Sequence, residues 1–429
     1  MKHVISNIIN NTQMGIKELT KFIASCGKLT LYTNYKDTHV LVDMFQKLYR
    51  YCSRDDISSL QKGYIYNKHL RAVINCVNQL LKFGITPIFV FDGMSILTKT
   101  INKSNEEQNK IIKTINPNNQ NIINNTNFSN KKTFKITQQQ VKDCIALIHY
   151  MGLPYVRAPF EADSQCAVMT MKCTNSSNNV PIKTVVTDDT DVLVFGATSM
   201  LRMLPMKIIS ILKKLFVGFT QLNVDVNKCY NICDMCNIVD PNHCDMDYDK
   251  LQYQVNTIIK YDVNTINNFI DDFNINFAVE YDIDEILLFL NNKANNIKPI
   301  INRKFTHNNF IDMCILFGTD YLPRIKQMSV DEVFELFVLS DYDVTTYINT
   351  INEQHKSIPE DYLKTFDDVK EYYTCASVID PRTIDISVLQ PMDDKIYELL
   401  RNNCFQHSFI INNLRTYKNN FNCLLNTSK

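Results

Sequence analysis

The sequence has no long hydrophobic run. Its 429 residues contain no stretch of roughly 18 consecutive apolar residues, which is the length that a membrane-spanning helix needs. The first residues, MKHVISNIINNTQ, include neither a continuous apolar region nor a small-residue cleavage site, so they do not have the pattern of a signal peptide. We therefore expect an intracellular protein that does not contact membranes.

Net charge is also missing, because the 45 basic and 45 acidic residues cancel. This balance argues against a protein that coats nucleic acid through bulk charge. Local clusters of either sign remain compatible with it, since buried carboxylates can bind cations while lysines elsewhere contact phosphates. The 14 cysteines are expected to be free thiols or metal ligands, because disulfides are rare in reducing compartments.

What the sequence does contain is the pattern of an α/β fold. Short β-branched and aromatic runs at 40–45 and 87–93 each lead to an aspartate, as buried parallel strands do. Residues 69–84 between them have apolar side chains at helical spacing and stop at a glycine. A third strand is expected over 184–196. The alternation predicts a central, mostly parallel sheet flanked by helices, with ligands beyond the carboxyl ends of its strands.

Two polar stretches interrupt this pattern. Residues 100–135 are rich in asparagine and dotted with lysines, and we expect them to be mobile when nothing is bound. Residues 206–279 are interpreted as an insertion. The insertion has a C-x2-C pair flanked by two further thiols: Cys229, Cys233, Cys236 and Cys244. This set could form a structural Zn²⁺ site, and a chance cluster among the many cysteines is the alternative.

Seven acidic residues stand at the ends of apolar segments or inside them: Asp43, Asp92, Glu161, Asp163, Asp189, Asp191 and Asp320. Clustered carboxylates raise one another's pKa values unless protons or cations neutralise them, and their oxygens select Mg²⁺ or Mn²⁺. Two such ions about 4 Å apart can activate a water and stabilise the leaving oxygen of a phosphodiester. A helix cap or surface turn explains any single acid equally well, but the E-x-D and D-x-D pairs favour a nuclease site. Asp188 is interpreted as a solvated neighbour.

The sequence around these acids resembles the flap endonuclease and 5′-exonuclease family, relatives of the XPG repair nucleases. Seven segments occur in the family's order: MGIKELTKFI, VLVDMFQKLY, GITPIFVFDG, YVRAPFEADSQCA, TDDTDVLVFGATSMLRML, FIDMCILFGTDYLPRI and IPEDYLKTFDDVKEYYTCASVIDP. The resemblance implies a PIN-like 5′-nuclease fold with a helical arch and a helix-turn-helix module for duplex DNA. It divides the chain into an N-terminal nuclease region (14–99), a mobile arch (100–135), an internal nuclease region (136–205), the insertion (206–279), a helix-turn-helix DNA-binding region (280–345) and the C-terminal part of the nuclease body (346–429).

The resemblance also assigns roles by position. It implies that the first four acids bind one Mg²⁺ and the last three a second Mg²⁺, with Mn²⁺ as a substitute. It assigns DNA contacts to six residues: Gly15, Tyr49, Lys99, Arg202, Arg324 and Lys326. Tyr49 would stack on an unpaired nucleotide, and Lys99 would take part in catalysis at the scissile phosphate. Core packing and a solvated loop are the alternatives for these two residues.

The sequence departs from the family in the turn after FGTDY. Gln327 and Ser329 occupy glycine positions where the family's backbone approaches duplex phosphate, so Arg324 and Lys326 are expected to compensate. The thirteen residues before Met14 are a second departure, and we expect the functional chain to start at Met14. A sliding-clamp motif is not recognisable.

The sequence therefore predicts a monomeric, Mg²⁺-dependent 5′ flap endonuclease or 5′–3′ exonuclease. Its substrates would be branched or 5′-ended DNA in replication, repair or recombination, and the EAD order at 161–163 favours the exonuclease branch. An RNA-cleaving relative and a non-cutting scaffold that binds branched DNA are the alternatives. The compact, Asn-rich sequence resembles a copy carried by a large DNA virus, for which a nuclear location or a cytoplasmic viral factory is expected.

Overall fold

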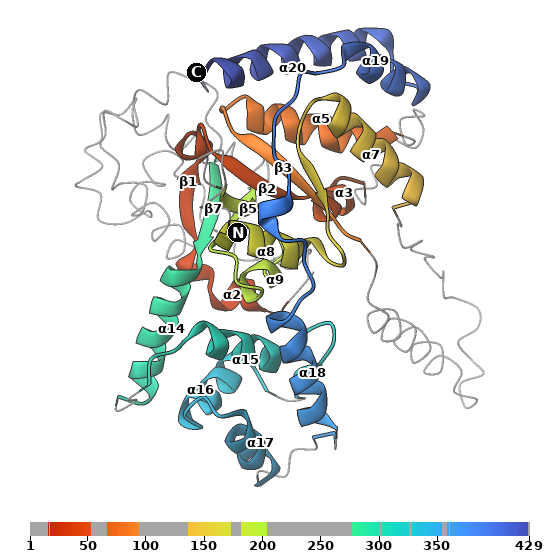
Figure 1. The fold of residues 1–429 in the computed structure, drawn as a ribbon. Coiled ribbons are helices and arrows are strands. Elements are labelled where there is room, and N and C mark those ends of the chain that lie inside the picture. The colour runs from red at the N-terminus through yellow and green to blue at the C-terminus, as the bar shows by residue number, and fades with distance from the viewer. Residues whose placement is uncertain are drawn as a thin grey trace, which may run out of the picture.

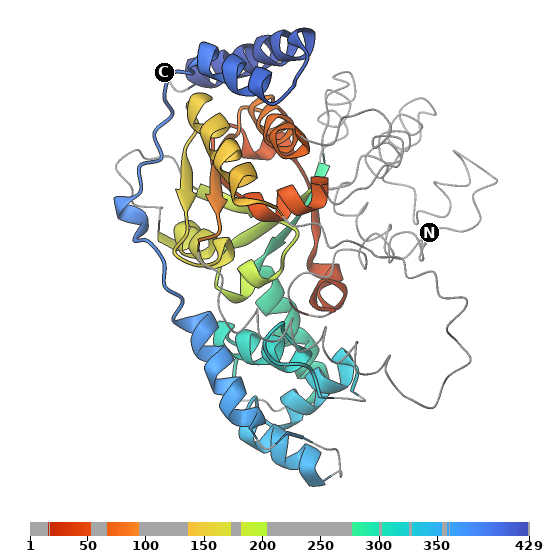
Figure 2. The same ribbon diagram turned by 90° about the vertical axis from the view of Figure 1, so that its right-hand side faces the viewer.

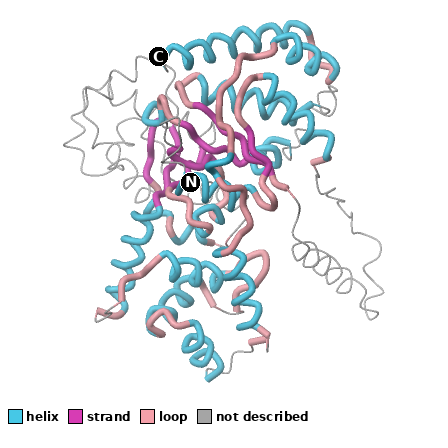
Figure 3. The backbone as a smooth tube through the Cα atoms, viewed as in Figure 1, coloured by secondary structure: helices cyan, strands magenta, loops and turns pink. Residues whose placement is uncertain are grey.

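A seven-stranded sheet with helices on both faces forms the centre of the part of the chain that the structure describes (Figure 1). The computed structural model describes residues 16, 18–52, 67–93, 136–172, 182–203, 277–299, 303–325, 328–353, 358–359 and 361–427. The strands lie in the order β1-β7-β6-β5-β2-β3-β4, and Figure 3 shows them between the layers of helices.

The sheet is mostly parallel, as predicted. Its parallel strands are β2 (His39–Asp43), β3 (Thr86–Phe91), β4 (Tyr155–Arg157), β5 (Ile182–Val186) and β6 (Ser199–Met203). Two further strands, β7 (Phe277–Asp282) and β1 (Lys28–Leu31), pair in antiparallel fashion at the β6 edge. Because β5, β2 and β3 are adjacent and parallel, the residues that follow them meet at one edge of the sheet.

One face of the sheet is covered by helices from the first half of the chain. Val40, Val42 and Phe89 point into a core formed with α3 (Met44–Cys52), α5 (Lys68–Leu81) and α7 (Gln138–Tyr150). The C-terminal helices α19 (Asp393–Asn402) and α20 (His407–Thr427) pack outside α5 and α7. The helix predicted over 69–84 is confirmed as α5.

The other face carries the helices of the site and the later helices. Leu41, Ile88 and Val90 point into this second core. It includes residues of α2 (Leu19–Phe22), α8 (Ala162–Lys172), α9 (Asp191–Val194), α14 (Ile283–Ile297), α15 (His307–Phe317), α16 (Val330–Leu339), α17 (Val344–Glu353) and α18 (Tyr362–Thr374). Short 3-10 turns lie at Ala24–Cys26, Tyr32–Tyr35 and Pro381–Thr383.

Helices α14 to α18 extend from one end of the sheet, whereas α19 and α20 lie at the opposite end (Figure 1). The segment between α18 and α19 runs along the side of the molecule to connect them (Figure 2). Gln165 fastens it to α8, because its side chain exchanges hydrogen bonds of 3.0 and 2.8 Å with the backbone of Ile379. None of the described helices is long and apolar enough to cross a membrane.

The strand predicted over 184–196 is wrong in its second half. Strand β5 ends at Val186, and residues 191–194 form the short helix α9. The chain turns between them because side-chain oxygens accept from nearby backbone: Asp189 N donates to Thr187 Oγ1 (3.1 Å) and Asp191 N to Asp189 Oδ1 (3.1 Å). A short, fully buried apolar run has no periodicity that separates helix from strand.

Candidate active site

Six of the seven predicted acids lie where three adjacent strands end. Asp43 is the last residue of β2, Asp92 follows β3, and Asp189 and Asp191 follow β5. Glu161 and Asp163 come from the beginning of α8, the helix that contacts β2, β3 and β5. We call these six residues the acidic edge: Asp43, Asp92, Glu161, Asp163, Asp189 and Asp191.

Asp43 is buried at the centre of the acidic edge, with 5% of its surface exposed. Gln46 N donates to its Oδ1 (3.2 Å), and Thr187 Oγ1 donates to its Oδ2 (3.2 Å). Burial, together with the charges of Asp92 and Asp189, nevertheless raises the pKa of Asp43 to about 7. The protein therefore does not fully compensate the charge of this carboxylate.

Asp163 shows the same lack of compensation more strongly. Burial, followed by the charges of Asp189, Asp43 and the other nearby acids, raises the pKa of Asp163 well above its ordinary value. Its Oδ1 is buried and has no hydrogen-bond partner among the residues that the structure describes. A buried carboxylate oxygen without a donor is costly unless a proton or a cation satisfies it.

The remaining acids of the edge are oriented by specific donors. Ala162 N donates to Asp92 Oδ1 (2.8 Å), which links the end of β3 to the first turn of α8. Ile16 N donates to Asp191 Oδ1 (3.0 Å), so the amino-terminal segment reaches the site. Two tyrosine hydroxyls, from Tyr321 and Tyr372, donate to Glu161.

The chemistry of the acidic edge suits a hard divalent cation. Carboxylate oxygens are the ligands that Mg²⁺ and Mn²⁺ prefer, and the unpartnered Oδ1 of Asp163 offers one such ligand. As the side chains stand, no three carboxyl, imidazole or thiol groups of the described residues converge closely enough for one ion. The donor set thus fits a divalent cation by its chemistry and its charge.

Asp320, the seventh predicted acid, lies apart from this group. It follows α15 and is exposed, and it is not among the carboxylates whose charges raise the pKa of Asp43 or Asp163. The turn that carries it is ordered by Thr319, whose hydroxyl accepts from the backbone of Tyr321 (3.1 Å) and Leu322 (2.9 Å).

Asp188 is not the solvated neighbour that the sequence suggested. It is 6% exposed, accepts from Arg50 Nη1, and lies 3.4 Å from Arg202 Nε. Burial alone would raise the pKa of Asp188, but the charges of Lys47, Arg50 and Arg202 outweigh burial and lower it. We call these four residues the Asp188 cluster. Adjacent acids in the sequence thus have opposite electrostatic surroundings.

Parts of the chain match two protein-family models and a group of known nucleases. Residues 14–113 match the XPG N-terminal domain, and residues 152–233 match the XPG I-region. Flap endonuclease 1 of Zea mays is 27% identical over 364 residues, which is 81% of this chain and 73% of that protein. These matches support an XPG/Rad2-type 5′ nuclease.

Solved structures of the XPG/Rad2 family share its fold. The catalytic core of Rad2 in complex with a DNA substrate has a TM-score of 0.58 and 16% identity, over 94% of this chain and all of that one. Flap endonuclease-1 from Methanococcus jannaschii has a TM-score of 0.54 and 17% identity, over 94% of this chain and 99% of that one. At such identities these structures support the family's fold alone.

Three of the DNA contacts that the XPG/Rad2 resemblance predicts can be located. Tyr49 lies half-buried on α3, with its ring 6.5 Å from that of Phe45, and burial and the charge of Asp92 raise the pKa of Tyr49. Arg202 is an ion-pair partner of Asp188. Arg324 Nη2 donates to Glu18 Oε1 (2.8 Å) and so connects the turn after α15 to the amino-terminal segment.

The turn that departs from the family has a structural explanation at Ser329. Its hydroxyl accepts from Glu332 N (3.2 Å), while Glu332 Oε2 accepts from Ser329 N (2.7 Å), and together they form a capping box at the start of α16. The carboxylate of Glu332 therefore lies at the amino-terminal end of α16. The resemblance places the approach of the family's backbone to phosphate at this position.

Sequence reasoning missed the groups that surround the acids. Tyr372 and Tyr373 donate to two acids of the edge, but tyrosine is common in this chain, with 21 residues, so the pair gave no signal. Lys47 and Arg50 could have been noticed as two cations on the helix that directly follows Asp43. The nine cysteines that the structure describes are free thiols.

Several predicted residues lie outside the described parts of the chain: Gly15, Lys99, Lys326, Cys229, Cys233, Cys236 and Cys244. The same holds for the region predicted as a mobile arch and for most of the insertion. Their assigned roles remain predictions.

Proposed function

We propose that this protein is a Mg²⁺-dependent 5′ nuclease that hydrolyses DNA phosphodiester bonds at 5′ flaps or free 5′ ends. Its matches to the XPG/Rad2 family support structure-specific cleavage of DNA. The observation that carries the proposal is the acidic edge, in which the buried Asp43 and the partly buried Asp163 lie beside other carboxylates whose charges raise their pKa values. Such an arrangement is costly without bound cations, so a scaffold with no catalytic role would have no reason to keep it.

The six acids of the edge, together with Asp320, would bind two Mg²⁺ ions, with Mn²⁺ as a substitute. Bound there, the ions would supply a water activated for in-line attack and stabilise the leaving oxygen, which yields a 5′-phosphate and a 3′-hydroxyl. The side chains act as ligands more than as proton donors. Thr187 and Gln46 keep Asp43 in place through their hydrogen bonds to its two carboxyl oxygens.

The DNA would approach the acidic edge over α3 and the helices from α14 onward. Tyr49 is suited to stack on an unpaired nucleotide, because its ring is half-buried and lies within the electrostatic reach of Asp92. Arg324, Lys326 and Lys99 would contact phosphates, and residues 280–345 would grip the duplex. The four cysteines of the insertion would bind a structural Zn²⁺. We expect a monomer that acts in a nucleus or in a viral factory.

The proposal is tested by cleavage of a 5′-end-labelled double-flap DNA, beside a matched RNA flap, by the protein in Mg²⁺. Release of the DNA flap near the junction, lost in Asp189→Asn and kept in the exposed control Asp394→Asn on α19, supports a flap endonuclease. Release of mononucleotides alone supports the exonuclease branch. Preference for the RNA flap, or tight binding to the DNA without cutting, would overturn the proposal. Removal of residues 1–13 tests whether the functional chain starts at Met14.

A further inference from the structure

Helix α18 ends with two adjacent tyrosines whose hydroxyl groups reach two different acids. Tyr372 OH donates to Glu161 Oε2, and Tyr373 OH donates to Asp191 Oδ2 (3.1 Å). Glu161 directly precedes α8, whereas Asp191 begins α9. One turn of one helix therefore contacts both acid-bearing segments, although more than 180 residues separate Tyr373 from Asp191 in the sequence.

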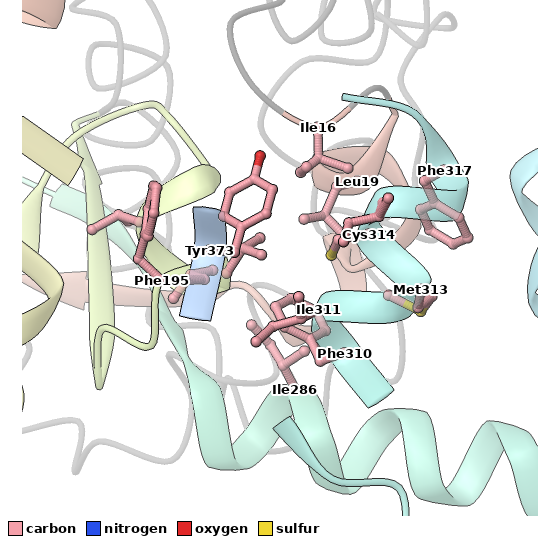
Figure 4. Close-up of a cluster of buried hydrophobic side chains, with 14 of the residues drawn as sticks. Ile16, Leu19, Phe195, Ile286, Phe310, Ile311, Met313, Cys314, Phe317 and Tyr373 are labelled. Atoms are coloured by element: carbon pink, nitrogen blue, oxygen red, sulfur yellow. The ribbon is translucent and has the colours of Figure 1, made fainter. Parts of the chain in front are cut away.

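Both rings are fixed by aromatic packing. The Tyr372 ring lies 5.3 Å from Phe195 and 4.9 Å from Tyr321, and the Tyr373 ring lies 4.9 Å from Phe195. Figure 4 shows Tyr373 among buried apolar side chains, with its hydroxyl directed away from Ile286 and Phe310. Because Tyr373 is only 3% exposed, its hydroxyl has little freedom to leave Asp191.

The packing of α18 makes these positions rigid. Phe366 and Val369 on the same helix are buried in the core that also contains residues of α15. Lys370 Nζ donates to the buried Asp312 of α15 (2.9 Å to Oδ2), one turn before the tyrosine pair. The tyrosine hydroxyls are thus held by a helix whose own position is set independently of the acids.

The hydroxyls are also suited to remain donors. A neutral phenol beside a carboxylate donates its only proton to that carboxylate. Glu161 receives a second such donor from Tyr321 (3.3 Å to Oε1).

We propose that Tyr372 and Tyr373 are positioning residues that set the orientations of Glu161 and Asp191 for divalent-cation binding. This inference rests on the proposed function, since it assumes that the acidic edge binds Mg²⁺ or Mn²⁺. Groups that hydrogen-bond to metal ligands fix the direction of the ligand oxygens, and losing one commonly lowers metal affinity by about 10- to 100-fold. Through the contact of Lys370 with Asp312 of α15, α18 also connects residues 280–345, which would bind duplex, to the place of cleavage.

The test is the affinity of the full-length protein for Mn²⁺, measured by calorimetry without DNA, for Tyr372→Phe and Tyr373→Phe. Phenylalanine keeps each ring and removes only the hydroxyl. Tyr362→Phe is the matched control, because Tyr362 lies on the same helix, is 3% exposed, and its hydroxyl has no partner among the described residues. We expect the Mn²⁺ Kd to rise about 10- to 100-fold in the two test variants and to stay unchanged in the control.

Two results would overturn the positioning role. One is a wild-type Kd in both Tyr372→Phe and Tyr373→Phe, with melting temperatures that show folded proteins. The other is an equal loss of Mn²⁺ affinity in Tyr362→Phe, which would indicate a general effect of packing. If the wild-type protein itself neither binds Mn²⁺ nor cleaves flap DNA, the proposed function fails as well, so the two failures are distinguishable.

Discussion

The acidic edge and the Asp188 cluster both include residues of the turn after β5, yet the charges around their carboxylates have opposite signs. Asp188 has three cations around it, Lys47, Arg50 and Arg202, and their charges lower its pKa. Asp43 and Asp163 have other acids around them, and the pKa of each is raised. The chain therefore neutralises Asp188 with its own side chains, whereas under the proposed function an external cation would neutralise Asp43 and Asp163.

Under the proposed function, this difference shows which feature distinguishes the metal-binding acids from Asp188. Both regions contain buried aspartates that follow a strand, so burial and position alone do not distinguish them. The distinguishing feature is the sign of the neighbouring charges, which a sequence does not reveal because the cations come from α3 and β6. Single substitutions can show whether charge compensation, more than burial, distinguishes the acidic edge from the Asp188 cluster.

Asp163→Asn should give the largest effect of these substitutions. It should lower the rate of flap cleavage without lowering the stability of the fold. Loss of this ligand is expected to lower the rate of flap cleavage on the order of 10³-fold, or about 4 kcal/mol in the barrier. The metal-free variant should be at least as stable as the wild type, because the amide removes a source of repulsion. Single-turnover cleavage and urea unfolding in EDTA measure the two quantities. A clear loss of stability would mean that Asp163 is compensated after all.

Asp188→Asn should have the opposite effects: it should lower the stability of the fold and change metal binding much less. It removes the counter-charge that Asp188 gives to the partly buried Arg50 and Arg202, and it leaves the buried Lys47 with the carboxylate of Asp43 alone. Breaking a buried ion pair from one side typically costs about 3 to 5 kcal/mol. Urea unfolding in EDTA should show this loss. The Mn²⁺ Kd of the folded variant should change much less than that of Asp163→Asn, and an unchanged stability would contradict the role given to the Asp188 cluster.

The sheet was predictable from the sequence because its strands are short apolar runs that end in acids, as at Asp43 and Asp92. Four of the seven acids also lie at one edge of the sheet because adjacent parallel strands bring them there, and α8 adds Glu161 and Asp163. The end of β5 was not predictable, because Val192 and Leu193 are buried in a helical turn that reads like a strand. Nor was the ion pairing of Asp188, which depends on Arg202 from a different strand. The spacing of apolar residues indicates local secondary structure, whereas the compensation of a buried charge depends on tertiary contacts.

Asp43 should lower the stability of the metal-free protein as the pH rises from about 4 to about 7. The pKa of Asp43 is raised to about 7, so over this range the native state binds more protons than the unfolded state, and the free energy of unfolding decreases, by up to about 4 kcal/mol. Asp188 contributes with the opposite sign, because its lowered pKa gives stability that is present above about pH 4 and lost below it. Thermal melting in EDTA across this range measures the fall.

Two controls sharpen the pH experiment. Asp43→Asn removes the titrating group and should flatten the fall between pH 4 and 7. Mg²⁺ should reverse much of the fall at pH 7, because it binds the ionised carboxylates of the native state and stabilises that state. An Asp43→Asn variant with the same pH dependence as the wild type in EDTA would show that the protein compensates the charge of Asp43.

Asp341→Asn should give the smallest effect, and it separates burial from charge pairing. Lys298 Nζ lies 2.6 Å from Asp341 Oδ1, but the aspartate side chain is 60% exposed, and such surface pairs contribute about 0 to 1 kcal/mol. Asn tolerates the left-handed backbone that Asp341 adopts, with φ of 53°. Urea unfolding beside Asp188→Asn compares the same substitution in two ion pairs. If both variants lose several kcal/mol of stability, burial does not explain the Asp188 cluster. If only Asp188→Asn loses that much, the cations of the cluster need a counter-charge because they are removed from water.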